Sequence, residues 1–158
     1  HLVHLGPTHV VASDLTRARQ TAEAVAGAAG LGVATERRLR EIDVGAWQGR
    51  TSAEVAAENP WFVDALREGR DFRRSDTGET AREAGARVAS VLAELGAAHA
   101  GRTVVVVGHG LSLRVGLSLL AGLGFEASFA LAGLWNCSWS ILDLQDRWRL
   151  QSYNNVLR

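Results

Sequence analysis

A histidine and an arginine follow short predicted strands, at the places where open α/β sheets bind their ligands. His109 comes directly after the valine run of residues 103–107, between two glycines, and Arg17 stands four residues past Ser13. Such sheets bind ligands beyond the carboxyl ends of their strands, close to helix N-termini. A guanidinium binds phosphate oxygens in bidentate fashion, and an imidazolium adds charge and a hydrogen-bond donor. The two positions therefore predict a phosphate-binding site.

A carboxyl group joins these two candidates. Glu41 follows the strand expected at residues 32–35 and precedes a turn-prone Asp-Val-Gly sequence. A carboxyl group beside a bound phosphate can protonate the leaving oxygen as a general acid. Arg17 and Glu41 also have simpler explanations, because arginines on helices and glutamates among arginines usually form solvated surface charges. A polar residue at the position of His109 is harder to explain by packing.

Short β-rich runs alternate with helical patterns, and this alternation predicts an α/β fold with a largely parallel sheet. The four consecutive valines of residues 103–107 leave no polar face, which predicts a strand covered on both sides. Strands are expected at residues 9–13, 32–35, 103–107, 139–144 and 148–152, and an apolar helix is expected from about residue 111 to residue 120.

Capping residues indicate where the other helices begin. We expect the carboxylate of Asp14 to cap the helix after the first strand. Two Thr-x-x-Glu sequences form capping boxes that open a short helix and a long one. The boxes are Thr51 with Glu54 and Thr80 with Glu83, and Pro60 is expected to start one further helix.

The composition limits the class of protein. A chain of 158 residues suits a single domain. Lys plus Arg and Asp plus Glu each number 17, and a formal net charge of zero disfavours a nucleic-acid partner. The single cysteine, Cys137, excludes an internal disulfide and a cysteine-based zinc cluster, and indicates a reducing compartment. Because no run approaches the ~20 apolar residues of a membrane span, we expect a cytoplasmic protein without a membrane partner.

Four segments occur in a fixed order along most of the chain. Residues 13–22 read Ser-Asp-Leu-Thr-Arg-Ala-Arg-Gln-Thr-Ala, and residues 39–49 read Leu-Arg-Glu-Ile-Asp-Val-Gly-Ala-Trp-Gln-Gly. Residues 78–80 read Gly-Glu-Thr, and residues 107–110 read Val-Gly-His-Gly. Together they resemble the phosphate-binding, acid, Gly-Glu-Ser/Thr and second-histidine motifs of the histidine phosphatase superfamily, the phosphoglycerate mutase-like enzymes.

This resemblance implies the fold and the extent of the domain. It implies a three-layer α/β/α sandwich with a largely parallel central sheet. A single histidine phosphatase domain would cover residues 1–158, with a small helical lid around residues 51–78.

The resemblance also implies a role for each matched residue. Arg17 would bind the transferring phosphoryl group, and His109 would hold phosphate oxygens and stabilise charge in the transition state. Glu41 would donate and accept the proton. Glu79 would line the pocket rim or orient the phosphate-binding residues, and the backbone N–H of Leu111 would contact substrate. No metal and no cofactor are expected, because positive side chains supply the electrostatic stabilisation.

The chain departs from the family pattern at the nucleophile. The family begins with a strand ending in Arg-His-Gly, whose histidine becomes phosphorylated, and no Arg-His-Gly occurs here. Losing that central strand would expose a wide apolar surface. We therefore expect that residues of the natural protein are missing, either before His1 or between Val3 and His4. A truncated protein and a natural pseudoenzyme are the second and third explanations.

For the complete enzyme the resemblance implies phosphomonoester hydrolysis through a phosphohistidine intermediate. The substrate would be a small phosphorylated metabolite of the sugar or glycerate phosphate type, because residues 47–49 and 134–139 resemble those of bacterial phosphatases. A phosphatase is favoured over a phosphoglycerate mutase, since the segment at residues 59–76 is short and family mutases carry longer lid insertions.

Three alternatives stay open at this point. The first is a phosphoglycerate mutase, and the second is a phosphate-ligand-binding protein without turnover, if the nucleophile is truly absent. The third is an NAD-binding module, weakened because Leu113 holds the place of the third glycine in the dinucleotide-binding fingerprint. The late strands or Trp135 and Trp139 offer a surface for a homodimer, and they are equally explained as core.

Overall fold

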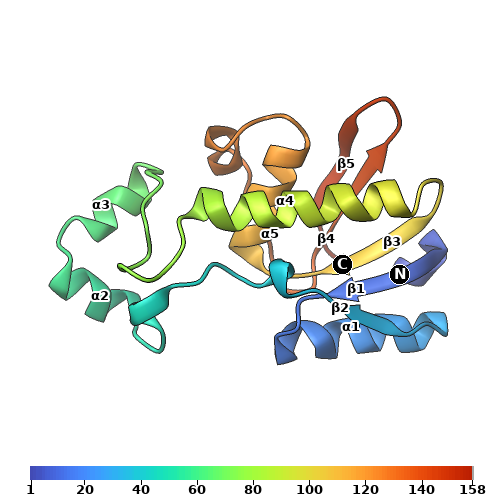
Figure 1. The fold of residues 1–158 in the computed structure, drawn as a ribbon, viewed down its shortest axis with the longest axis horizontal. Coiled ribbons are helices and arrows are strands. Elements are labelled where there is room, and N and C mark those ends of the chain that lie inside the picture. The colour runs from blue at the N-terminus through green and yellow to red at the C-terminus, as the bar shows by residue number, and fades with distance from the viewer. Residues whose placement is uncertain (158) are drawn as a thin grey trace.

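The strands form one parallel and one antiparallel sheet in the computed structural model, which describes residues 1–157 (Figure 1). The first sheet has the order β2-β1-β3, and the second is the hairpin β4-β5. Ala12 pairs with Val107, so β1 and β3 end at the same edge of the parallel sheet. The strand bounds are β1 Pro7–Ala12, β2 Val33–Thr35, β3 Thr103–Val107, β4 Trp139–Leu144 and β5 Trp148–Asn155.

Helices cover both faces of the parallel sheet, and the predicted three-layer α/β/α arrangement is confirmed (Figure 1). On one face α1 packs against Val105 and Val107, and on the other α4 packs against Val104 and Val106. The valine strand is thus covered on both sides as predicted. Its valines are only half-buried, because β3 is an edge strand of its sheet. The helix bounds are α1 Thr16–Ala29, α4 Ala81–Ala98 and α5 Gly110–Leu120.

The helices α4 and α5 pack at close range because two glycines face the contact. A Cβ atom at Gly85 of α4 would collide with Val115 of α5, and one at Gly116 would collide with Val88. Both valines are fully buried. This contact fixes the position of α5, whose N-terminus borders the candidate site.

Two short helices, α2 (Ser52–Glu58) and α3 (Phe62–Arg67), project to one end of the molecule (Figure 1). Phe62 of α3 packs edge-on against Trp47 and Phe72, and Trp61, the residue before α3, packs edge-on against Phe72. The remaining helical turns are η1 Leu2–Leu5, η2 Arg37–Leu39, η3 Gly45–Trp47 and η4 Glu126–Phe129.

Both predicted capping boxes are present at the starts of α2 and α4. The predicted cap at Asp14 is wrong, because Leu15 is the N-cap residue of α1 and no side chain caps it. Both carboxylate oxygens of Asp14 instead accept hydrogen bonds of 2.6 Å from the guanidinium of Arg40. Two charge-assisted hydrogen bonds outweigh one bond to a neutral backbone N–H.

Other boundaries differ slightly from the prediction. Helix α3 begins at Phe62 rather than at Pro60, and β5 continues to Asn155. Within residues 1–157, no helix has the length and apolar character that crossing a membrane requires.

Candidate active site

The carboxyl ends of β1 and β3 bring Ser13 and His109 together. The backbone N–H of Ser13 donates to the carbonyl oxygen of Val107 at 2.9 Å, which continues the pairing of the two strands. Beyond this bond, the Ser13 hydroxyl lies 2.9 Å from Nε2 of His109. Ser13 is fully buried, and His109 is 8% exposed. The structure therefore holds the imidazole in a fixed orientation at the strand ends.

Glu41 lies at the N-terminus of α5, where backbone N–H groups lack partners within the helix. Its Oε1 accepts from the N–H of Ser112 at 2.9 Å and from that of Ile42 at 2.9 Å. Its Oε2 accepts from the N–H of Leu111 at 3.0 Å. Helix N-termini bind anions because these N–H groups and the helix dipole point outward. The carboxylate of Glu41 thus occupies an anion-binding position at the N-terminus of α5.

Arg17 stands in the first turn of α1, the helix that follows β1. Its side chain is exposed, and within residues 1–157 it makes no ion pair. The charge of Arg17 nevertheless acts on His109, since it contributes to lowering the pKa of that imidazole. Arg17 and His109 therefore both follow the strand ends of the parallel sheet, at the starts of α1 and α5.

The pKa of His109 is lowered from 6.5, mainly because burial disfavours the charged imidazolium. The positive charges of Arg17 and Arg87 lower it further, while Glu41 and Asp14 oppose them. A bound phosphate would reverse this balance, because a nearby negative charge stabilises the imidazolium.

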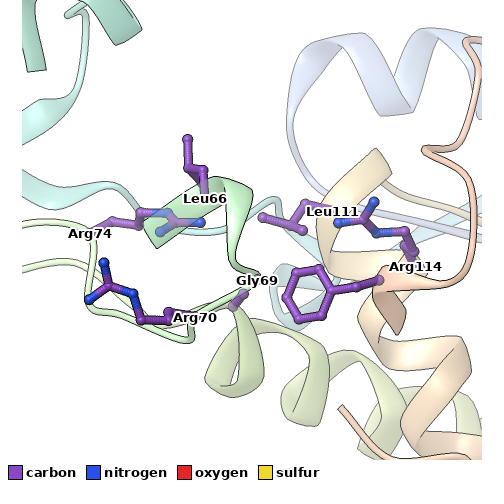
Figure 2. A pocket seen from close by; sticks show the side chains of 8 residues that line it. Leu66, Gly69, Arg70, Arg74, Leu111 and Arg114 are labelled. Atoms are coloured by element: carbon purple, nitrogen blue, oxygen red, sulfur yellow. The ribbon is translucent and has the colours of Figure 1, made fainter. Parts of the chain in front are cut away.

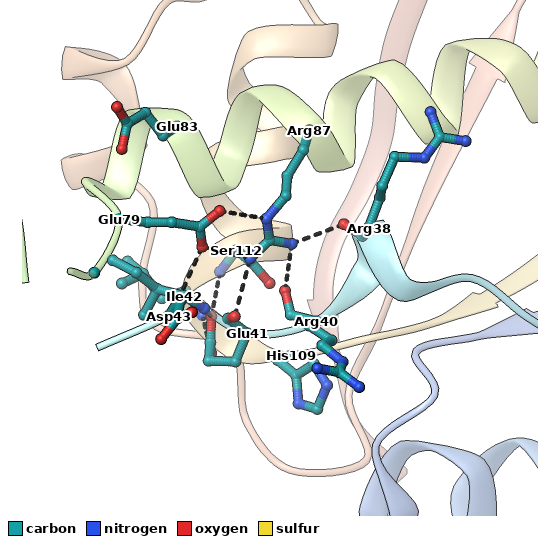
Figure 3. Close-up of polar contacts among 12 residues, drawn as sticks. Arg38, Arg40, Glu41, Ile42, Asp43, Glu79, Glu83, Arg87, His109 and Ser112 are labelled. Carbon is teal, nitrogen blue, oxygen red and sulfur yellow. Dashed lines mark hydrogen bonds and ion pairs between the residues drawn. The ribbon is translucent and has the colours of Figure 1, made fainter. Parts of the chain in front are cut away.

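Glu79 does not project freely into the site but pairs with Arg87 of α4. Its two oxygens accept from Nε and Nη2 of Arg87, each at 2.8 Å, and one also accepts from the N–H of Asp43 at 2.9 Å (Figure 3). The pKa of Glu79 is lowered, first because of the hydrogen bonds from Arg87. Glu79 therefore orients the loop that carries Glu41.

Arg87 also holds that loop through its backbone. Its remaining N–H groups donate to the carbonyl oxygens of Arg38, Arg40 and Glu41, at 2.7, 2.7 and 2.9 Å (Figure 3). Together with the bonds to Glu79, these contacts use every N–H of the guanidinium. Arg87 thus fixes the backbone at Glu41.

The sequence did not single out Arg87. The acceptors of its side chain are spread from residue 38 to residue 79, so no local spacing marks it. Glu41 itself forms no ion pair with the arginines that precede it within the described residues 1–157. Arg38 pairs with Glu36 and Glu94, and Arg40 pairs with Asp14.

Comparison with protein families gives a match over almost the whole chain. A model described as the histidine phosphatase superfamily (branch 1) matches residues 1–156. The probable phosphoglycerate mutase GpmB of Yersinia pestis (strain Pestoides F) is 36% identical over 141 residues. That match covers 89% of this chain and 65% of the relative, so the chain spans less than two-thirds of the length of such relatives.

Solved structures resemble the chain along nearly its full length. A structure named mycobacterial hydrolase 1 superposes with a TM-score of 0.88 at 34% identity, covering 99% of this chain and 79% of that one. A mycobacterial glucosyl-3-phosphoglycerate phosphatase in complex with VO3 gives a TM-score of 0.86 at 34% identity, covering 98% and 80%. Together with the family match, these similarities confirm the predicted resemblance and fold: the chain belongs to the histidine phosphatase superfamily, branch 1.

Proposed function

We propose that the whole protein hydrolyses the phosphomonoester of a small metabolite, with the phosphoryl group bound between Arg17, His109 and the N-terminus of α5. The position of the Glu41 carboxylate is the observation that supports this proposal most strongly. The backbone N–H groups of Leu111 and Ser112, at the start of α5, hold the carboxylate of Glu41 beside the buried imidazole of His109. An anion-binding position and an acid–base group therefore lie next to each other.

The two oxygens of Glu41 are held unequally. Oε1 accepts two backbone hydrogen bonds, from Ile42 and Ser112, whereas Oε2 accepts only the one from Leu111. An arriving phosphoryl oxygen that takes the N–H of Leu111 frees Oε2 and leaves Oε1 anchored. Oε2 is then the atom that carries the proton in the reaction.

The reaction proceeds in two steps whose atoms balance. A nucleophilic histidine attacks phosphorus, the bond to the ester oxygen breaks, and Oε2 of Glu41 protonates the departing alcohol. In the second step Glu41 takes a proton from water, the water oxygen attacks phosphorus, the bond between phosphorus and the histidine nitrogen breaks, and inorganic phosphate leaves the regenerated histidine. Arg17 and His109 stabilise the negative charge of the phosphoryl oxygens in both steps. The nucleophile is not among the residues of this sequence, and we assign it to a part of the natural protein outside them.

The substrate class we propose is a sugar or glycerate phosphate. Relatives named phosphoglycerate mutase and glucosyl-3-phosphoglycerate phosphatase support this class. The short segment that holds α3 supports a hydrolase over a mutase, because retaining a phosphorylated intermediate requires a site closed to water. A phosphoglycerate mutase is the second candidate, and it is supported by the name of the relative from Yersinia pestis.

The test is to incubate the full-length protein with 3-phosphoglycerate and measure both inorganic phosphate and 2-phosphoglycerate. Release of phosphate alone supports the hydrolase, and formation of 2-phosphoglycerate supports the mutase. Binding of the ester without either product indicates a phosphate-binding protein without turnover.

A matched pair of variants tests the site itself. Arg17→Ala should lower kcat/KM by about 10²-fold or more, because it removes a phosphate ligand. Arg19→Ala, an exposed arginine on the same helix, should leave kcat/KM unchanged. Equal effects of the two variants would remove Arg17 from the site.

A further inference from the structure

A hollow of about 250 Å³ lies beside the candidate active site, between α3, the loop after it and α5 (Figure 2). Leu66, Leu111 and Phe129 give it apolar walls, and Arg74 and Arg114 bring positive charge. A second hollow shares Leu111 and Arg114 with the first and reaches Gly110, the residue after His109. A ligand held at the N-terminus of α5 can therefore extend over Leu111 into the first hollow.

Two arginines in this hollow have buried nitrogen atoms without partners. Within the described residues 1–157, Nη1 of Arg74 and Nε of Arg114 are buried and make no hydrogen bond. Burial lowers the pKa of the Arg74 guanidinium, and Asp71 acts in the opposite direction. An unsatisfied buried donor destabilises the folded state, and a charged donor does so more strongly. Both nitrogen atoms are therefore available to donate to an anionic ligand.

Aromatic rings hold both guanidinium groups in place. The Cζ atom of Arg74 lies 3.8 Å from the ring centroid of Phe72, and that of Arg114 lies 5.8 Å from that of Phe129. A ring binds the flat face of a guanidinium and leaves its N–H edges free for hydrogen bonds. Figure 2 shows the two groups extending toward each other from opposite sides of the hollow.

The neighbouring arginines of this region differ, because carboxylates already neutralise them. The pairs are Arg67 with Asp64, Arg70 with Glu68, and Arg73 with Glu83. Neither Arg74 nor Arg114 forms an ion pair within residues 1–157. The unpaired positive charge of this region is therefore concentrated in the hollow.

We propose that Arg74 and Arg114 form a subsite for a second anionic group of the substrate, a carboxylate or a second phosphate. This inference rests on the proposed function, because it takes the phosphoryl group to lie at the N-terminus of α5. The protein then selects doubly anionic phosphoesters over esters of the same size that carry one anionic group. Leu111 separates the two sites, with its N–H facing the first and its side chain lining the second.

The test compares two matched pairs of esters on the full-length protein. The first pair, 3-phosphoglycerate and glycerol 3-phosphate, differs by a carboxylate in place of a hydroxymethyl group. The second pair, fructose 1,6-bisphosphate and fructose 6-phosphate, differs by a phosphate. The dissociation constant of each ester is measured by calorimetry, and kcat/KM by release of phosphate.

We expect the doubly anionic member of one pair to bind at least about tenfold more tightly. Arg74→Gln and Arg114→Gln should each reduce that preference several-fold. The control Arg67→Gln, whose arginine is exposed and paired with Asp64, should retain it. The thermal unfolding midpoint of each free variant checks that it folds.

The outcomes separate the subsite from the reaction. A preference for 3-phosphoglycerate identifies a carboxylate, and a preference for the bisphosphate identifies a second phosphate. Equal dissociation constants within both pairs, or a preference that survives both arginine substitutions, overturn the subsite. An arginine-dependent preference in binding without any release of phosphate supports the subsite and contradicts the hydrolase.

Discussion

Arg87 holds the main chain of Glu41, since its Nη2 donates to the Glu41 carbonyl oxygen at 2.9 Å. The same guanidinium binds both oxygens of Glu79. The proposed proton donor thus lies on a loop without a regular helix or strand, and one arginine from α4 fixes its backbone. Loops that carry reactive groups need such support, because a displacement of about 1 Å can cost 10²-fold in rate.

Substituting Arg87 by lysine should therefore lower the stability of the protein. A lysine cannot reach Glu79 and three carbonyl oxygens at once, so buried acceptors lose their donors. We expect a loss of about 2–3 kcal/mol in the free energy of unfolding. Urea denaturation measures it, with Arg82→Lys on the same helix as the control. The exposed ion pair of Arg82 with Glu126 should contribute less than about 1 kcal/mol. Equal losses would contradict the role of Arg87.

The contact between α4 and α5 should tolerate no additional atom at Gly85. An alanine there would press its Cβ against Val115 and displace the helix whose N-terminus forms the site. We expect Gly85→Ala to lower the free energy of unfolding by about 1–3 kcal/mol. Gly27→Ala on α1 is the matched control, because a Cβ there meets nothing within 4 Å. That substitution should stabilise the helix by roughly 0.5–1 kcal/mol.

Burial of His109 should make stability depend on pH. Its pKa is lowered from 6.5 in the folded protein, so the unfolded chain binds more protons around that pH. The contribution of the neutral imidazole is therefore fully present above about pH 6.5 and is lost as the pH falls below it. Urea denaturation measures the free energy of unfolding at about pH 8 and about pH 5.5. Between these pH values it should fall by less in His109→Gln than in the wild type. The control variant His4→Gln, whose histidine is exposed, should lose as much stability between the two pH values as the wild type does. If His109→Gln also lost as much as the wild type, the pH dependence would not come from His109.

Replacing Glu41 by glutamine should separate esters by their leaving groups. Glutamine cannot donate a proton as a carboxyl group does, so the hydrolysis of esters with poor leaving groups should slow most. We expect kcat to fall by about 10²-fold or more for glycerol 3-phosphate and by much less for p-nitrophenyl phosphate. Steady-state kinetics on the full-length protein measure both values. The same loss for both esters would show that Glu41 does not protonate the leaving group.

The sequence predicted where the strands next to the candidate site end. It predicted less well the contacts between distant residues that position the side chains of the site. The valine run before His109 identifies the strand β3, so the position of His109 just beyond a strand end was predictable. Its contact with Ser13 depends on the parallel pairing of β1 with β3 and was not predicted. Local capping signals also predicted the starts of α2 and α4, since a capping box involves only neighbouring residues.

Contacts between distant residues were not predictable in this way. Asp14 carries the signature of a helix cap, and its binding to Arg40 depends on how two loops meet in space. The hollow likewise joins Arg74 and Arg114, whose local sequences resemble those of ordinary surface arginines. Only the packed structure distinguishes these two from the arginines paired with carboxylates.

The most direct test of the proposed phosphate site follows the amide signals of Leu111 and Ser112 by NMR while orthophosphate is added to the full-length protein. If α5 binds the phosphoryl group, the Leu111 amide exchanges its bond to Glu41 for one to phosphate. Its signal should then shift in a saturable manner, and Arg17→Ala should weaken that binding by about tenfold or more. Saturable binding that shifts other amides and leaves Leu111 and Ser112 unchanged would contradict the proposed site.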